Sequence, residues 1–234
     1  SDLDAIRIEI SAQPDAIQIR TVRPSESRGS VGARYFIKVP RQTQLDRISS
    51  SNASIRIADV EGGARVKTSN GAVRTENLRG SLDVQTSNGS IEVRSQEGAA
   101  ILRTSNGRIT AEDIRGAFEA VTSNGRISAE IARPEAGRAI RVETSNGRVD
   151  LALDREIKSD VRVSTSNGSI TLRLPDDAGG RLLAVTTNST VHTDFDVKSD
   201  GPPNKRRLEG LLGSGAGPLF DLSTSNGSIR IVRQ

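Results

Sequence analysis

Thr104-Ser105-Asn106-Gly107 is one of seven identical copies of Thr-Ser-Asn-Gly in this chain of 234 residues, and these copies decide the fold. The copies begin at Thr68, Thr86, Thr104, Thr122, Thr144, Thr165 and Thr224. Two degenerate copies, Ser50-Ser51-Asn52-Ala53 and Thr186-Thr187-Asn188-Ser189, extend the series. The first five asparagines are 18 residues apart, and the later intervals are 22, 21, 21 and 38. A period of about 20 residues is typical of stacked repeats.

Aliphatic residues flank each asparagine at fixed distances and with period two. The residues three positions after it are Ile55, Val73, Ile91, Ile109, Ile127, Val149, Ile170, Val191 and Ile229. The residues four positions before it are Ile48, Val66, Val84, Leu102, Ala120, Val142, Val163, Ala184 and Leu222. Alternation of this kind predicts a short strand on each side of the Ser-Asn-Gly turn, with these residues pointing inward.

Two architectures fit a strand, a turn, a strand and a second turn. Asn-Gly between alternating runs is a strong hairpin signal and suggests an antiparallel meander. An open meander of about 18 strands would need a second layer over its apolar face, and no residues remain to supply one. We therefore predict an all-β fold: a single-stranded parallel β-helix, or β-solenoid, of about nine coils.

Stacked identical turns also predict a ladder of asparagine amides. Asparagine tolerates the left-handed conformation, and its amide can bond to the asparagine one coil away. The predicted ladder consists of Asn52, Asn70, Asn88, Asn106, Asn124, Asn146, Asn167, Asn188 and Asn226. The threonine two positions before each asparagine shares the parity of the core residues, so we expect it to point inward and not to form an outward threonine face.

The chain is predicted to be one solenoid domain, 1–234, in four parts. Residues 1–45 contain strand-like runs at 6–10, 16–22 and 34–39 and are expected to cap the stack, as solenoid ends require. Residues 46–193 hold repeats, 194–218 are an insertion, and 219–234 form the last repeat. Leu208, Leu211 and Leu212 follow helical spacing, which predicts one or two helical turns that fold back over the solenoid.

Composition narrows the chemistry. Aromatic residues make up 2% of the chain and apolar residues 34%, which suits a narrow aliphatic core. There is no cysteine, and His192, the single histidine, follows the inward Val191 and should point outward. We therefore predict no metal site, no cofactor and no catalytic residue.

The strongest surface feature is a row of arginines. Arg108, Arg126 and Arg148 occupy the same outward position, two residues after the asparagine, on three successive coils. Like charges at this spacing repel, so we expect compensation from Glu112 and Glu130 on the same strands. The row is either an ion-paired surface or a site for an anionic glycan, a teichoic-type polymer or a lipid headgroup. Nucleic acid is not expected, because no aromatic residues interleave with the basic ones.

Acidic residues raise the alternative of a carbohydrate-active β-helix enzyme. Enzymes of that class use paired carboxylates within about 5–10 Å of each other. Asp59, Asn77 and Glu112-Asp113 stand at equivalent positions of their coils, where they are expected to be turn residues that bond to local backbone. A cleft with two carboxylates would favour the enzyme, whereas a smooth rod with buried asparagine ladders would favour a binding module.

The lead-in Tyr35-Phe36-Ile37-Lys38-Val39-Pro40-Arg41, the registered turns and glycine corners such as Val60-Glu61-Gly62 and Ile114-Arg115-Gly116 carry a family resemblance. Over residues 33–193 and 219–234 the chain resembles a bacterial family of adhesin-like β-strand-repeat proteins of unknown function. The resemblance implies a right-handed β-helix displayed at the cell envelope, and it supplies no catalytic residues.

We therefore expect a non-enzymatic envelope module, an adhesin or scaffold that contacts a surface polysaccharide or an envelope protein. Position 1 is not methionine, so we expect a processed or truncated chain that is exported to the periplasm or cell surface. Membrane contact is expected only through an anchor outside this sequence. The last repeat runs almost to Gln234 without a visible cap, which predicts end-to-end self-association.

Overall fold

The computed structural model describes residues 7–14, 16–22, 32–154, 157–199, 204–213 and 215–234. The chain divides into two units, Ser1–Val39 and Pro40–Gln234. All regular elements in the described ranges are strands, so the all-β prediction is confirmed. None of the described segments is a helix with the length and apolarity needed to cross a membrane.

The first unit contains an antiparallel pair, β1 (Arg7–Ala12) and β2 (Ile17–Val22), in which Ile10 lies opposite Ile19. This confirms the first two predicted runs, apart from position 6, which lies outside the described residues. The third run, at 34–39, forms no strand. A side-chain bond joins Tyr35 to Thr21 of β2, but no described strand of its unit pairs its backbone with this run, so its alternating pattern has no ladder to join. The capping role of residues 1–45 stays a prediction.

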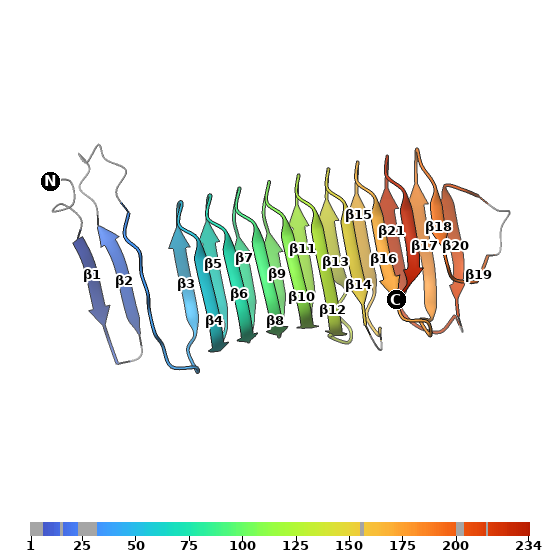
Figure 1. Cartoon of the computed structure of the whole chain (residues 1–234). Helices are drawn as coiled ribbons and strands as arrows, with labels where there is room; N and C mark the ends of the chain where they lie inside the picture. The colour runs from blue at the N-terminus through green and yellow to red at the C-terminus, as the bar shows by residue number, and fades with distance from the viewer. Residues whose placement is uncertain (1–6, 15, 23–31, 155–156, 200–203, 214) are drawn as a thin grey trace. The chain divides into compact units, whose positions relative to one another are not determined.

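The second unit is a β-solenoid with parallel strands in two facing sheets (Figure 1). The strands that precede the turns are β3 (Leu45–Ser50), β5 (Ala64–Thr68), β7 (Leu82–Gln85), β9 (Ala100–Arg103), β11 (Phe118–Thr122), β13 (Ile140–Thr144), β15 (Val161–Thr165), β17 (Gly180–Thr186) and β21 (Leu219–Thr224). The strands that follow them are β4 (Ile55–Glu61), β6 (Val73–Arg79), β8 (Ile91–Glu97), β10 (Ile109–Gly116), β12 (Ile127–Pro134), β14 (Val149–Leu153), β16 (Ile170–Leu174), β18 (Val191–Thr193) and β22 (Ile229–Arg233).

The core lies between the two sheets and uses the positions that the alternation predicts. Ile109 pairs in register with Ile91 on one side and Ile127 on the other, and Ile109 and Ile127 are fully buried. From the opposite sheet, Leu102 and Phe118 close the same space. Because each such side chain stabilises the fold by about 1.5–3 kcal/mol when buried, the stacked aliphatic rows hold the coils together.

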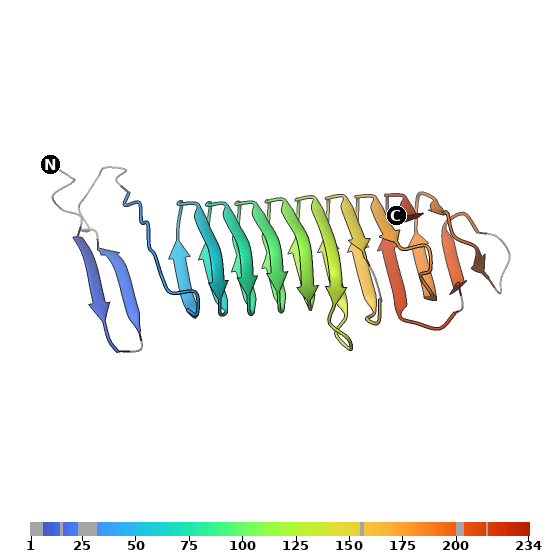
Figure 2. The same cartoon turned by 60° about the horizontal axis from the view of Figure 1, so that its bottom comes forward.

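The order of the coils departs from the prediction at the carboxyl-terminal end. About seven turns follow one another in sequence order, so the expected count of about nine is slightly too high for a continuous winding. The last repeat then enters the stack out of order: β21 lies between β15 and β17, and β22 between β16 and β18. Figures 1 and 2 show this pair of strands inside the stack.

The insertion forms strands, not the predicted helical turns. β20 (Arg207–Leu212) runs antiparallel along the outer edge of β17, and β19 (Val197–Lys198) pairs with β20. The free edge of β17 offers unpaired backbone groups, which overrides the helical spacing of the leucines. Leu212 is buried and Leu208 packs on the core, so two of the three leucines do cover this end. Residues 200–203 and 214 of the insertion lie outside the described ranges.

The position of the last repeat removes the basis for end-to-end pairing, which was a last coil without a cap. The last repeat is enclosed on both sides by other coils and is not an uncapped end. The edge beyond it is covered in one sheet by β20 and β19. Self-association therefore stays a prediction without its original structural basis.

Candidate functional site

The Thr-Ser-Asn-Gly edge of the solenoid is held together by side-chain bonds from coil to coil. Every ladder asparagine except Asn52, which only accepts, donates from its Nδ2 to the Oδ1 of the asparagine on an adjacent coil over 2.6–2.8 Å. In space the ladder runs Asn52, Asn70, Asn88, Asn106, Asn124, Asn146, Asn167, Asn226 and Asn188. The predicted ladder therefore forms, but the asparagines are exposed and not buried.

The threonine and glycine of the motif hold adjacent coils together on the buried side of the same edge. The Thr104 hydroxyl accepts a hydrogen bond from the Gly107 amide at 3.1 Å and donates to the Gly89 carbonyl of the next coil at 3.1 Å. The motif threonines are buried, as predicted, so this edge presents no outward threonine face. A Cβ at Gly107 would lie 1.8 Å from the Gly89 carbonyl oxygen, which explains why glycine recurs here. The threonine, asparagine and glycine of the motif thus each have a structural role.

The arginine row forms as predicted, but its compensation differs. Arg108, Arg126 and Arg148 are all exposed, and the backbone bonds from Ile109 N to Arg126 O and from Ile127 N to Arg148 O place them on successive coils. Arg126 binds Asp150, which is only 8% exposed, through two bonds of 2.9 and 2.6 Å.

The two outer arginines of the row have no acidic partner among the described residues. Arg148 donates to the Ser169 hydroxyl at 3.0 Å, and Arg108 makes no side-chain bond there. The predicted partner Glu112 instead binds Arg94 at 3.2 Å, because Arg94 stands directly opposite it on the neighbouring strand. Glu130, the other predicted partner, makes no ion pair in the described part of the chain.

A second polar surface lies toward the carboxyl ends of strands β4, β6, β8 and β10 of the same sheet, where each of these strands contains a bulge residue. Asp59, Asn77, Ser95 and Asp113, each seven residues after its asparagine, adopt left-handed backbone with φ of 57°, 52°, 52° and 53°. Asparagine and aspartate favour this conformation because their short polar side chains bond locally. The turn role expected for Asp59, Asn77 and Asp113 is wrong: they are left-handed residues within β4, β6 and β10, and their side chains bond to other side chains and not to local backbone. Glu112 also lies in a strand and pairs with Arg94.

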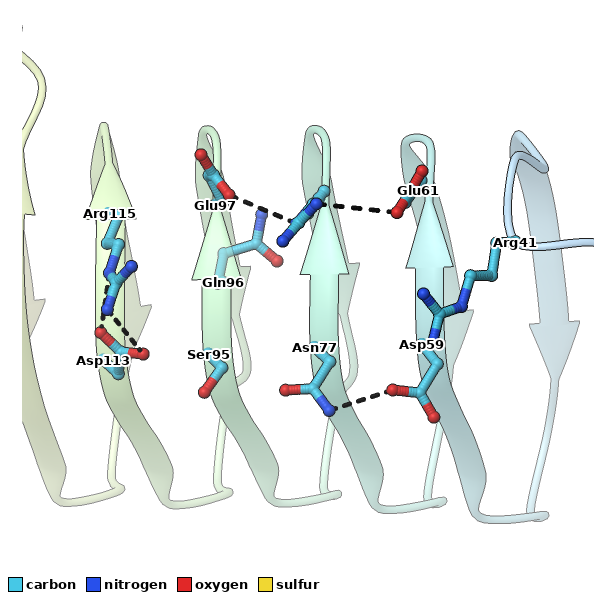
Figure 3. Close-up of a pocket in the computed structure, with 10 residues that line it drawn as sticks. Arg41, Asp59, Glu61, Asn77, Ser95, Gln96, Glu97, Asp113 and Arg115 are labelled. Carbon is cyan, nitrogen blue, oxygen red and sulfur yellow. Dashed lines mark hydrogen bonds and ion pairs between the residues drawn. The ribbon is translucent and has the colours of Figure 1, made fainter.

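These bulges border a groove of about 320 Å³ that crosses four coils (Figure 3). We call it the bulge groove, and its lining residues are Arg41, Asp59, Glu61, Asn77, Arg79, Ser95, Gln96, Glu97, Asp113 and Arg115. Sequence reasoning missed it as a site. The only available signal was the polar residue repeated seven positions after the asparagine.

The charges of the bulge groove are almost balanced and largely paired. Arg79 lies between two carboxylates of adjacent coils, at 3.7 Å from Glu61 and 3.5 Å from Glu97. Arg115 binds Asp113 at 3.0 Å within one strand. Asp59 accepts a hydrogen bond from Asn77 at 3.0 Å, so every carboxylate of the lining has a partner (Figure 3).

Comparison with known proteins gives one match, at the level of the whole chain. A family model described as Toastrack DUF4097 matches residues 9–231. The searches of curated proteins and of solved structures find no match. Since the family model spans both units, the chain belongs to the Toastrack DUF4097 family, whose function is unknown.

Proposed function

We propose that the protein is a non-enzymatic module of the cell envelope, an adhesin or scaffold that binds an anionic surface polymer through Arg108, Arg126 and Arg148. The observation that carries this proposal is the uneven compensation of the row. Arg108 and Arg148 are exposed and have no acidic partner in the described ranges, while Arg126 is held by Asp150. The guanidinium groups of Arg108 and Arg148 are therefore available for phosphate or carboxylate groups, which arginine binds in a bidentate manner.

The spacing of the row supports a polymeric ligand. Neighbouring strands of a sheet lie about 4.8 Å apart, so the row repeats a guanidinium group at that interval, with the central Arg126 shared with Asp150. A polymer that carries regularly spaced anionic groups can contact several of these arginines at once, and each contact raises the effective concentration for the next. Binding should weaken as salt rises, because the site is exposed and screened.

Binding of the purified chain to a panel of cell-wall and surface polysaccharides tests this proposal. We expect salt-sensitive binding to a teichoic acid or an acidic glycan, lost in the Arg108→Ala/Arg126→Ala/Arg148→Ala variant. The matched control removes three arginines of the same sheet that are already paired with Glu76, Glu92 and Glu112: Arg56→Ala, Arg74→Ala and Arg94→Ala. Equal losses in the two triple variants would mean that net charge, and not the row, determines binding.

The runner-up is a carbohydrate-active enzyme with the bulge groove as its active site. The observation in its favour is the presence of four carboxylates in the lining, Asp59, Glu61, Glu97 and Asp113. Against it, each carboxylate is bound to a guanidinium or amide group and is not placed as a free acid-base pair. Release of reducing ends from a polysaccharide, abolished by Asp113→Asn, would favour the enzyme over the binding module.

Display at the envelope, a protein partner and self-association are further parts of this proposal. The first two are supported by the resemblance to adhesin-like repeat proteins and by the repetitive surface of the stack. Fractionation of the source cells with an antibody to the chain tests the localisation. Recovery in the cytoplasmic fraction alone would contradict it.

A further inference from the structure

Gln96 interrupts an otherwise apolar row in the core behind the bulge groove. Its pairing partners on the two adjacent strands are Leu78 and Ile114, and the row continues to Val60 and Ile131. Gln96 is only 1% exposed. A glutamine at an aliphatic core position breaks the local pattern, and such departures concentrate at functional sites.

The carbonyl oxygen of the Gln96 side chain has no hydrogen-bond partner in the described part of the chain, whereas its amide nitrogen has one. Its Nε2 donates to the Gly80 carbonyl at 2.6 Å, which fixes the orientation of the amide, because the reversed amide would set two carbonyl oxygens against each other. Its Oε1 is buried and accepts no hydrogen bond. A buried acceptor without a donor is costly, so it calls for an explanation beyond packing.

The bulge groove also has a gap directly beside Gln96. The bond between Asp59 and Asn77 is not continued at Ser95, whose side chain makes no bond within the described residues, and Asp113 on the next coil binds Arg115 instead. Figure 3 shows Gln96 between the row of bulge residues and the row that contains Glu97. The Gln96 Oε1 and the Ser95 hydroxyl, which have no hydrogen-bond partner among the described residues, therefore both belong to residues that line the bulge groove.

We propose that the bulge groove binds a neutral, hydroxyl-rich glycan segment that lies along the stack, with Gln96 and Ser95 at its centre. The lining holds four carboxylates and three guanidinium groups, so it does not select a strongly charged polymer. Sugar hydroxyls both donate and accept, and they match carboxylate acceptors, guanidinium donors, the Ser95 hydroxyl and the Gln96 carbonyl. The Gln96 Oε1 is closed off from solvent in this structure, so the proposed contact requires the side chain to turn toward the groove, which breaks the bond from Nε2 to the Gly80 carbonyl.

This site differs from the arginine row in both ligand and position. The row occupies the start of β10, β12 and β14, whereas the bulge groove lies toward the ends of β4, β6, β8 and β10. No aromatic side chain lines the groove, so hydrogen bonds must provide the affinity, and we expect weak binding that depends on several adjacent sugars.

Saturation-transfer NMR and calorimetry with three neutral hexasaccharides, cellohexaose, chitohexaose and mannohexaose, test the inference on the whole chain. We expect saturable binding of at least one of them. Gln96→Leu should weaken it about tenfold, the effect of one lost hydrogen bond to a ligand. Ser95→Asn, which fills the gap and tolerates the left-handed backbone, should weaken it by a similar factor.

Matched controls separate this site from general effects. Gln85→Leu makes the same substitution at an exposed position of β7 and should leave binding unchanged, as should the arginine-row triple variant. Denaturation curves confirm that each variant folds. The inference is overturned if none of the hexasaccharides binds, if both groove variants bind as the unmodified chain does, or if only the arginine-row variant loses binding. These outcomes are independent of whether the arginine row binds an anionic polymer.

Discussion

The two edges of the solenoid differ in how closely adjacent coils are bonded to each other. At the Thr-Ser-Asn-Gly edge the side chains bond to their copies on the neighbouring coils, and the glycines leave no space between the backbones. At the opposite edge the coils differ in length, four of those in the described ranges have a left-handed bulge residue, and a groove opens. The comparison teaches that the most repeated residues hold the coils to each other, while the capacity for binding lies where the repeat varies.

The largest expected loss of stability follows from adding a methyl group at the Thr-Ser-Asn-Gly edge. In Gly107→Ala the new Cβ would meet the Gly89 carbonyl oxygen at 1.8 Å, and backbone cannot yield as a side chain does. We expect a loss of more than about 4 kcal/mol in the free energy of unfolding, measured by urea denaturation. The control is Gly137→Ala, where no atom lies within 4 Å and only the positive φ of 77° costs stability, about 1 kcal/mol. Similar losses at both sites would show that the coils are not closely stacked.

The next effect tests the inward and outward positions that both edges share. Ile109 is fully buried between its partners on neighbouring coils, so Ile109→Ala should cost about 2–5 kcal/mol. His192 is exposed, and its ring bonds only to Thr190 at 2.9 Å, so His192→Ala should change stability by less than about 0.5 kcal/mol. Thermal melts of the two variants should therefore differ widely, and equal shifts would contradict the register of the strands.

A smaller loss is expected from the buried hydroxyl of the repeated edge. Thr104→Val keeps the shape of the side chain but leaves the Gly107 amide and the Gly89 carbonyl without their partner. We expect a cost of about 1–3 kcal/mol by chemical denaturation. Thr110→Val, on the outer side of β10, should stay within about 0.5 kcal/mol. A neutral Thr104→Val would indicate that the hydroxyl bonds are formed equally well with water.

The smallest effect should have the opposite sign and occur at the variable edge. Ser95 has left-handed backbone without a side-chain bond to support it, so Ser95→Gly should stabilise the chain by about 0.5–1 kcal/mol. Ser87→Gly at the repeated edge has no positive φ to relieve and should destabilise by about 0.5–1 kcal/mol. Denaturation midpoints of this pair sharpen the comparison of the edges. Two changes of the same sign would contradict it.

The repeat itself was predictable because its signals are local and redundant. Parity places Ile109 and Ile127 inside, and the same turn recurs with its asparagine in register, so each coil confirms the next. The position of the last coil was not predictable, because identical turns fit any slot in the stack equally well. For the same reason Asn226 bonds to both Asn167 and Asn188, although the sequence places it after both.

The candidate sites were only partly predictable. The arginine row follows from spacing alone, but its ion pairs do not: Arg126 binds Asp150 and not Glu130, and Glu112 binds Arg94 and not Arg108, because the pairing depends on which residues lie on the adjacent strands. The bulge groove depends on backbone conformation at Asp59 and Ser95 and on a buried glutamine. Their one periodic signal, the polar residue seven positions after the asparagine, indicates neither the left-handed backbone nor the unpaired glutamine.

The enclosed position of β21 and β22 has a consequence for the assembly of the stack during synthesis. The first coils can each settle on the one before as soon as they are made, because every contact is only one repeat away in the chain. β17 and β18 have no such option, since their place is fixed by strands that are made later and that also pair with β15 and β16, 59 residues upstream at Thr165–Thr224. Contacts over so long a separation form slowly. Completion of this end must therefore await synthesis of β21 and β22, and loss of these strands would open a gap within the stack instead of shortening it.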